Sequence, residues 1–266
     1  MKNNKRQWFR TPAATWTLFI AAIALLLFAG IGGTRAALNK LSDKYVAEVS
    51  MQDIGITLME NGSEVAKRDY DYAKKDDSWI VSSSGKLLAD MLKDGEQPEI
   101  GKAYDETLAV KNSGHINEYV RVTIRRYWLD KDGNKMNDLE PEQIGLMLDH
   151  KNLDEETTLG DWVKDTAATT TERSVFYYTK LLGPGETTSN LTDKFFIRGD
   201  LLNKYTTNVE KEGDTITKIT TAYDYDGVQF CLEVTADAVQ DHNAQAAILS
   251  AWGRNVTVSG SGLSLQ

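Results

Sequence analysis

The chain is poor in the residues that build disulfide-stapled or metal-dependent folds. It has 266 residues but only one cysteine, Cys231, and three histidines. A single thiol cannot close an internal disulfide, so packing alone must hold the fold. The histidines are not paired at metal-ligand spacing, and without cysteine partners they offer little for a zinc site. We therefore expect neither a disulfide framework nor a zinc centre.

Basic charge is scarce outside the first 36 residues. Residues 1–36 carry five basic side chains and no acid, whereas the remainder carries 25 basic and 39 acidic residues, a net charge of −14. An acidic body repels phosphate and has no basic stripe, which argues against a nucleic-acid partner. The same balance fits a soluble protein that meets cations at a cell surface.

Long apolar runs are absent except near the N-terminus. Four basic residues precede an apolar stretch at residues 16–31, and glycines then lead into Thr34-Arg35-Ala36. This order predicts a signal helix and a secretory signal peptide at residues 1–36, cleaved between Ala36 and Ala37, with Thr34 and Ala36 as the small residues that the peptidase needs. The alternative is an uncleaved membrane anchor, because the stretch is close to the length of a span.

The remaining chain, residues 37–266, shows a two-residue apolar period and turn signals. Asn61-Gly62 is hairpin-turn chemistry, and Gly183-Pro184-Gly185 stops another apolar run. Many short strands with turns between them indicate a single all-β domain, a sandwich or a barrel. The predicted strands cover residues 54–58, 107–110, 119–128, 175–182, 191–197, 215–222 and 228–239.

Few segments of this domain have a helical pattern. Short helices are predicted at residues 86–93, at 141–148 with Pro141 near the start, and at 241–252 with a cap at Asp241. The segment at about 149–173 is polar and rich in Thr, Asp and Glu, so we expect a surface excursion there.

Two acidic turns are the nearest approach to a metal site. Their candidate calcium ligands are Asp130 and Asp132 in one turn and Asp224 and Asp226 in the other. Neither turn has the full spacing of a calcium loop, and Asp-Gly is also common hairpin chemistry, so we interpret both as turns. No nucleophile, base and oxyanion site is legible, and the sequence predicts neither an enzyme nor a bound cofactor.

Four segments carry a resemblance to a known family. The end of the signal segment, residues 32–39, resembles signals cut by the SipW-type peptidase of Gram-positive bacteria, although Arg35 and Leu38 depart from the usual pattern. The others are the turn Asp94-Gly95-Glu96 followed by strands at 108–114 and 119–122, the segment 177–188, and the segment 235–240. Taken together, the chain is similar to the TasA and camelysin-like exported proteins.

The resemblance implies a jelly-roll-like antiparallel β-sandwich and a secreted cell-surface or biofilm-matrix structural protein. In such fibres the N-terminal segment of one subunit adds as a strand to the next subunit. The implied partners are the signal peptidase and other copies of the chain or a related matrix subunit, with membrane contact only through an uncleaved N-terminus. The donor segment would contain Ala37, Leu38, Leu41, Tyr45 and Val46.

Two other functions stay open at this point. One is a surface binding or accessory protein of the same fold that does not polymerise. The other is a metallopeptidase, because camelysin-like proteins are described as such, although no metal ligands are legible in the chain.

Overall fold

A computed structural model describes residues 54–70, 79–83, 87–88, 91, 98–203, 205–212, 215–223 and 227–266. The chain divides into two units, residues 1–50 and 51–266, and every described residue belongs to the second. Most of the helix predicted at 86–93 lies outside the described residues. So do the signal helix, the cleavage site, the donor segment and two calcium candidates: Thr34, Ala36, Ala37, Leu38, Leu41, Tyr45, Val46, Asp224 and Asp226.

The described strands form two antiparallel sheets that share one apolar core. The first sheet has the order β3-β2-β1-β4-β12-β7-β8, and the second has the order β15-β5-β11-β10-β9, with β6 paired to β5. This arrangement confirms the predicted all-β sandwich. From β4 onward the chain passes back and forth between the sheets, which is jelly-roll-like connectivity.

The strand bounds follow the two sheets. The first sheet contains β1 (Ile56–Glu60), β2 (Ser63–Tyr70), β3 (Trp79–Ser83), β4 (Ala103–Asn112), β7 (Ile144–Leu148), β8 (Lys151–Asn152) and β12 (Thr192–Ile197). The second contains β5 (Glu118–Leu129), β6 (Lys135–Met136), β9 (Thr158–Leu159), β10 (Trp162–Lys164), β11 (Arg173–Tyr178) and β15 (Gln229–Gln240). A separate hairpin, β13 (Tyr205–Glu212) and β14 (Thr215–Tyr223), pairs only with itself among the described residues.

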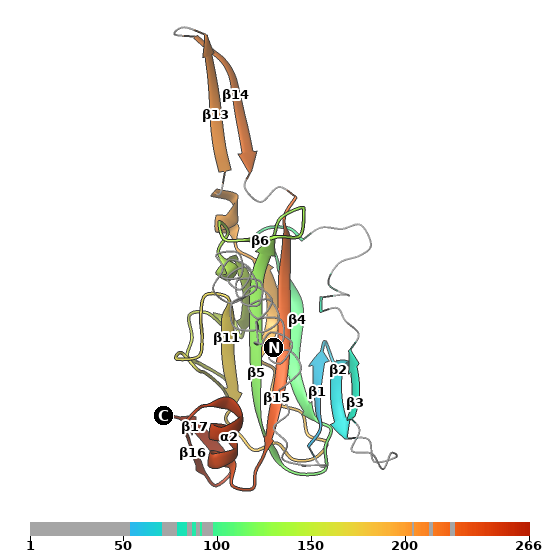
Figure 1. Cartoon of the computed structure of the whole chain (residues 1–266). Coiled ribbons are helices and arrows are strands. Elements are labelled where there is room, and N and C mark those ends of the chain that lie inside the picture. The colour runs from blue at the N-terminus through green and yellow to red at the C-terminus, as the bar shows by residue number, and fades with distance from the viewer. Residues whose placement is uncertain are drawn as a thin grey trace, which may run out of the picture. The chain divides into compact units, whose positions relative to one another are not determined.

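The long strands β5 and β15 run side by side over their whole length (Figure 1). Successive side chains of a strand point to opposite faces, so one parity of β5 faces the core and the other faces outward. Val120, Val122 and Ile124 are at most 1% exposed, whereas Arg125 is exposed. The two-residue apolar period of residues 119–128 therefore corresponds to a core face and an outer face of the sheet.

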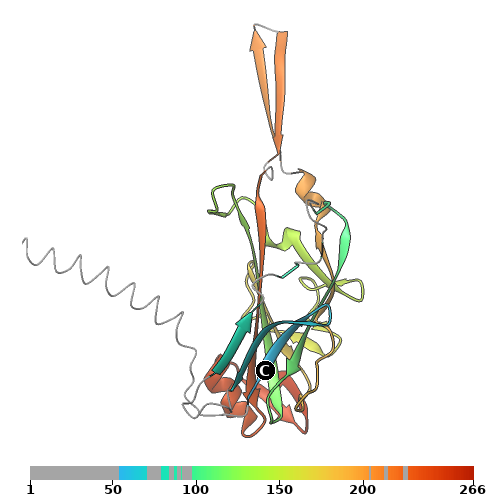
Figure 2. The same ribbon diagram turned by 90° about the vertical axis from the view of Figure 1, so that its right-hand side faces the viewer.

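A third layer covers part of the outer face of the second sheet. Helix α2 (Ala244–Trp252) and the hairpin of β16 (Val256–Ser259) and β17 (Gly262–Leu265) pack there against Tyr119, Tyr177 and other side chains (Figures 1 and 2). The helix predicted at 241–252 ends at the expected residue but begins three residues later, at Ala244. Its N-cap is Asn243 in a left-handed conformation, while the Asp241 backbone N–H donates to Asn117 O.

The helix predicted at 141–148 is wrong beyond its first turn. A short 3₁₀ turn, η2 (Pro141–Gln143), leads directly into β7. Ile144, Leu146 and Leu148 alternate along β7 and are buried, which is a strand period. The pairing of β7 with β12 requires a glycine at position 145, because a Cβ there would lie 2.2 Å from the ring of Phe196 on β12. The second 3₁₀ turn, η3, spans Gly199–Asn203.

The predicted polar excursion at about 149–173 is also wrong, because this segment belongs to the sandwich. It supplies β8, β9 and β10, and its apolar residues Leu153, Leu159 and Trp162 are at most 1% exposed. These three side chains are spread among polar neighbours, so the short strands give no visible period.

A buried charge cluster holds this segment in place. The Arg126 guanidinium, on the core side of β5, donates two hydrogen bonds to the Asp154 carboxylate, at 2.8 and 2.5 Å. It also donates to Ile144 O of the first sheet at 2.9 Å and to the Ser174 hydroxyl of β11 at 3.2 Å. Lys164 Nζ donates to the carbonyls of residues 153 and 154, and burial lowers the pKa of Lys164. We call Arg126, Asp154 and Lys164 the core clamp.

Removing one partner of the clamp should destabilise the fold strongly. We expect Arg126→Ala to lower the free energy of unfolding by about 3–5 kcal/mol, because it leaves a largely buried carboxylate without its partner. The double variant Arg126→Met/Asp154→Leu should recover much of that loss. Urea denaturation measures both.

Lys180→Ala is the matched control, since Lys180 pairs with Asp161 but is 59% exposed. Exposed pairs contribute about 0–1 kcal/mol. A loss in Arg126→Ala no larger than in this control would contradict the role of the clamp.

Candidate functional site

The acidic turn at Asp130 is a hairpin turn between β5 and β6. Asp130 Oδ1 accepts the backbone N–H groups of Asp132 and Asn134, each at 2.8 Å, and Asp130 Oδ2 accepts the Asn134 amide at 3.1 Å. These hydrogen bonds, led by those from Asn134, lower the pKa of Asp130. Both carboxylate oxygens of Asp130 therefore accept hydrogen bonds within the turn. Among the described residues no group of three or more His, Cys, Asp and Glu side chains is placed to hold a metal ion.

The outer edge of β15 is the main candidate site. Strand β15 pairs with β5 on one side, and no described strand pairs with its other side. Hydrogen bonds alternate between the two sides of a strand in an antiparallel sheet. On β5 the N–H groups of Glu118 and Arg126 donate toward the β11 side, to Leu182 O and Glu172 O. Odd-numbered residues of β5 therefore bond to β15.

The register of β5 and β15 then shows which backbone N–H and C=O groups of β15 point away from β5. Odd-numbered residues of β5 lie opposite odd-numbered residues of β15, as in the pair Thr123↔Thr235. The groups that point away from β5 consequently belong to the even-numbered residues of β15. Gln240, at the end of the strand, is the polar one, and the others are Phe230, Leu232, Val234, Ala236 and Ala238.

The side chains of these same residues line an incompletely covered part of the core. Each is half-buried, whereas most of their opposite neighbours on β5 are buried, as in Val234↔Ile124 and Ala236↔Val122. The core-facing side chains are therefore less buried on β15 than on β5. Open backbone groups and partly exposed apolar side chains occur at the same residues, which is what an added strand would cover.

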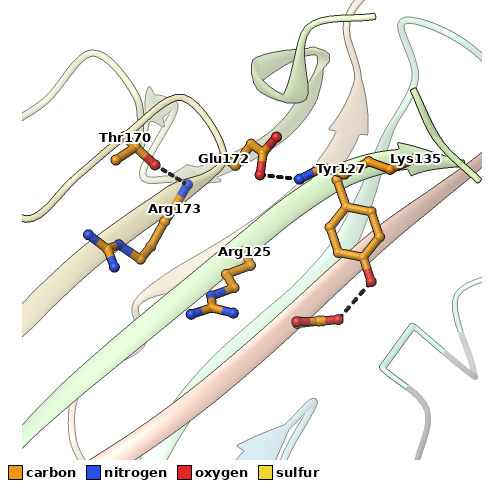
Figure 3. A pocket seen from close by; sticks show the side chains of 7 residues that line it. Arg125, Tyr127, Lys135, Thr170, Glu172 and Arg173 are labelled. Carbon is orange, nitrogen blue, oxygen red and sulfur yellow. Dashed lines mark hydrogen bonds and ion pairs between the residues drawn. The ribbon is translucent and has the colours of Figure 1, made fainter. Parts of the chain in front are cut away.

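A polar hollow lies on the outer face of the second sheet. It encloses about 450 Å³ and is lined by Arg125, Tyr127, Lys135, Thr170, Glu172, Arg173 and Glu233. We call it the arginine hollow. Figure 3 shows the guanidinium groups of Arg125 and Arg173, from neighbouring strands, on the same side of the sheet. Sequence periodicity placed Arg125 on this face but could not bring Thr170 and Glu172 beside it.

Most side chains that line the hollow form hydrogen bonds or ion pairs with neighbouring residues. The Tyr127 hydroxyl donates to Glu233 Oε1 at 2.7 Å, and this bond raises the pKa of Tyr127. Lys135 forms an ion pair with Glu172 and lies over the Tyr127 ring. Arg173 donates twice to Ala168 O, at 3.0 and 2.8 Å. Arg125 has no partner among the described residues.

Two buried carboxyls lie apart from these surfaces. Glu118 is 0% exposed, neither of its carboxyl oxygens has a hydrogen-bond partner, and burial followed by the Asp69 charge raises its pKa to about 9. Burial and the neighbouring Glu60 raise the pKa of Glu106 to about 8, against a hydrogen bond from Asn61 that lowers it. Both groups are therefore protonated in the folded protein at neutral pH.

These raised pKa values predict a loss of stability with rising pH. The folded protein keeps the Glu118 proton up to about pH 9, whereas the unfolded chain releases it near 4.5. The stabilisation is fully present below pH 4.5 and is lost as the pH rises toward 9. One proton contributes at most about 1.4 kcal/mol per pH unit.

Glu118→Gln should therefore flatten the fall in unfolding free energy between pH 5 and pH 8, as measured by urea denaturation. The exposed-face variant Glu172→Gln should leave that slope unchanged. An unaltered slope in Glu118→Gln would mean that Glu118 is ionised in the folded protein.

Comparisons with known proteins gave no match to a protein-family model, to a curated protein or to a solved structure. No helix among the described residues is long and apolar enough to cross a membrane. The geometry of the β15 edge and of the arginine hollow therefore carries the functional argument.

Proposed function

We propose that this chain is an exported structural protein of a bacterial cell surface or biofilm matrix, and that copies join by strand addition. The observation that carries the proposal is the open edge of β15, where backbone groups that no described strand pairs with coincide with half-buried apolar side chains. The resemblance of the sequence to TasA and camelysin-like exported proteins points in the same direction.

The physics of an open edge supports strand addition. An edge strand presents a row of N–H and C=O groups that can template another chain, and natural proteins usually shorten, charge or cover such edges. Strand β15 has 12 residues. Its edge-facing residues are apolar from Phe230 to Ala238 and end with Gln240, without lysine or proline among them. A second strand would complete the hydrogen-bond ladder and bury the exposed parts of Phe230, Leu232 and Val234.

The proposed occupant is the segment at residues 37–49 of another copy. It is long enough to lie along β15, and it carries Leu38, Leu41, Tyr45 and Val46 for apolar contact. Signal cleavage would switch assembly on, because a segment that is still tethered to a membrane is not free to dock on a neighbouring molecule.

A surface binding protein that does not polymerise is the second candidate. The arginine hollow favours it, because the unpartnered Arg125 offers a charged contact to a ligand whether or not copies assemble. Behaviour after cleavage separates the two functions.

The test compares recombinant residues 37–266 with the same chain carrying a short N-terminal extension, by negative-stain electron microscopy. We expect filaments only from the free Ala37 end. Monomers from both proteins would overturn the polymer proposal and favour the binding protein.

The matched pair Ala236→Pro and Ala236→Val tests the acceptor edge. Proline removes the edge-facing N–H of residue 236 without removing a bond to β5, and edge strands tolerate it. Valine keeps that N–H. We expect filaments from Ala236→Val and none from Ala236→Pro, with circular dichroism confirming that both are folded. Equal filament formation by the two would place the acceptor elsewhere.

A further inference from the structure

We propose that the arginine hollow binds a carboxylate-bearing sugar of an anionic polysaccharide. The hollow lies on the outer face of the second sheet and is lined by three cationic and two acidic side chains together with Tyr127 and Thr170. The hollow has a volume of about 450 Å³ and is open to solvent. This site is separate from the open β15 edge, where only the backbone and the core-facing side chains of β15 take part.

The guanidinium of Arg125, which has no partner among the described residues, indicates that the ligand carries an anionic group. Arg125 lies directly opposite Arg173 in the register of β5 and β11, and directly opposite Glu233, whose Oε1 accepts the Tyr127 hydroxyl, in the register of β5 and β15. Like charges opposite each other on one sheet face are destabilising. Arg173 is fixed by its two hydrogen bonds to Ala168 O, and Arg125 is exposed without a partner among the described residues. A carboxylate between the two guanidinium groups would relieve the repulsion and accept paired N–H donors.

The rest of the hollow suits sugar hydroxyls better than further anionic groups. Glu233 accepts the Tyr127 hydroxyl through Oε1, and its second oxygen, Oε2, can accept a further hydrogen bond. The Thr170 hydroxyl can both donate and accept. Sugar hydroxyls donate to such carboxylates, whereas closely spaced phosphates would be repelled by Glu172 and by Glu233.

The inference does not depend on polymerisation, because the binding is measured on a single molecule. The protein is residues 37–266 bearing Ala236→Pro, which we expect to stay monomeric, or the N-terminally extended chain if that variant does not fold. Isothermal titration calorimetry at 150 mM salt uses tetragalacturonate and its methyl ester, which has the same sugars without the charge. We expect the acid to bind at least tenfold more tightly than the ester.

Arg125→Gln is the decisive variant, and Lys180→Gln is its control. Both remove one positive charge from an exposed side chain, but Lys180 is not part of the hollow. We expect Arg125→Gln to weaken tetragalacturonate binding at least tenfold and Lys180→Gln to leave it within twofold.

Three results would overturn the proposal. The first is an equal affinity for the acid and the ester, and the second is unchanged binding in Arg125→Gln. The third is equal or tighter binding of hexaglutamate or inorganic phosphate, which would show that the hollow recognises anions without regard to the sugar. Failure of filament formation in the separate imaging test bears on strand addition and leaves this binding measurement unaffected.

Discussion

The buried pair of Arg126 and Asp154 is the constraint on which the rest of the structure depends. Arg126 stands on the core side of β5, yet it donates to the first sheet through Ile144 O and to β11 through Ser174. A guanidinium can occupy this position only if its charge is matched, since burying an unpaired charge is costly. Asp154 supplies the match, and Lys164 fixes the backbone on either side of it. The segment before β11 is thereby tied to both sheets.

This closed side of the second sheet contrasts with the open side at β15. Near the clamp, β9, β10 and β11 cover the core, and Trp162 and Phe176 are 0% exposed. At β15 the apolar side chains of the core face are only half-buried, and the backbone groups beside them have no described partner. The sheet therefore ends on one side in β9, a strand of two residues beside buried side chains, and on the other in β15, a strand of 12 residues whose core-facing side chains are only half-buried. That asymmetry is the structural basis of the proposed assembly.

Sequence periodicity predicted the long strands well, because each has enough alternating residues to reveal its faces. The same periodicity indicates that Arg126 points into the core, because it has the same parity as Val120, Val122 and Ile124. Glu118 shares that parity. What the pattern could not provide was the partner, because Asp154 lies in a polar stretch whose strands have only two or three residues.

The remaining errors have the same physical origin. Strand β7 follows a proline that is equally typical of a helix start, and its pairing with β12, which buries Ile144, Leu146 and Leu148, decides between the two. The arginine hollow joins residues from β5, β6, β11, β15 and the segment before β11, so no local pattern could predict it. Tertiary contacts, and not local preference, determine both.

The most direct test of strand addition at β15 is residue-resolved amide hydrogen exchange with and without a peptide of residues 37–49. If the account is right, the amides of Phe230, Leu232, Val234, Ala236 and Ala238 exchange faster than their odd-numbered neighbours in the free protein, and the peptide slows them selectively. Uniform protection along β15 without peptide, or no change at these five amides with it, would contradict the account.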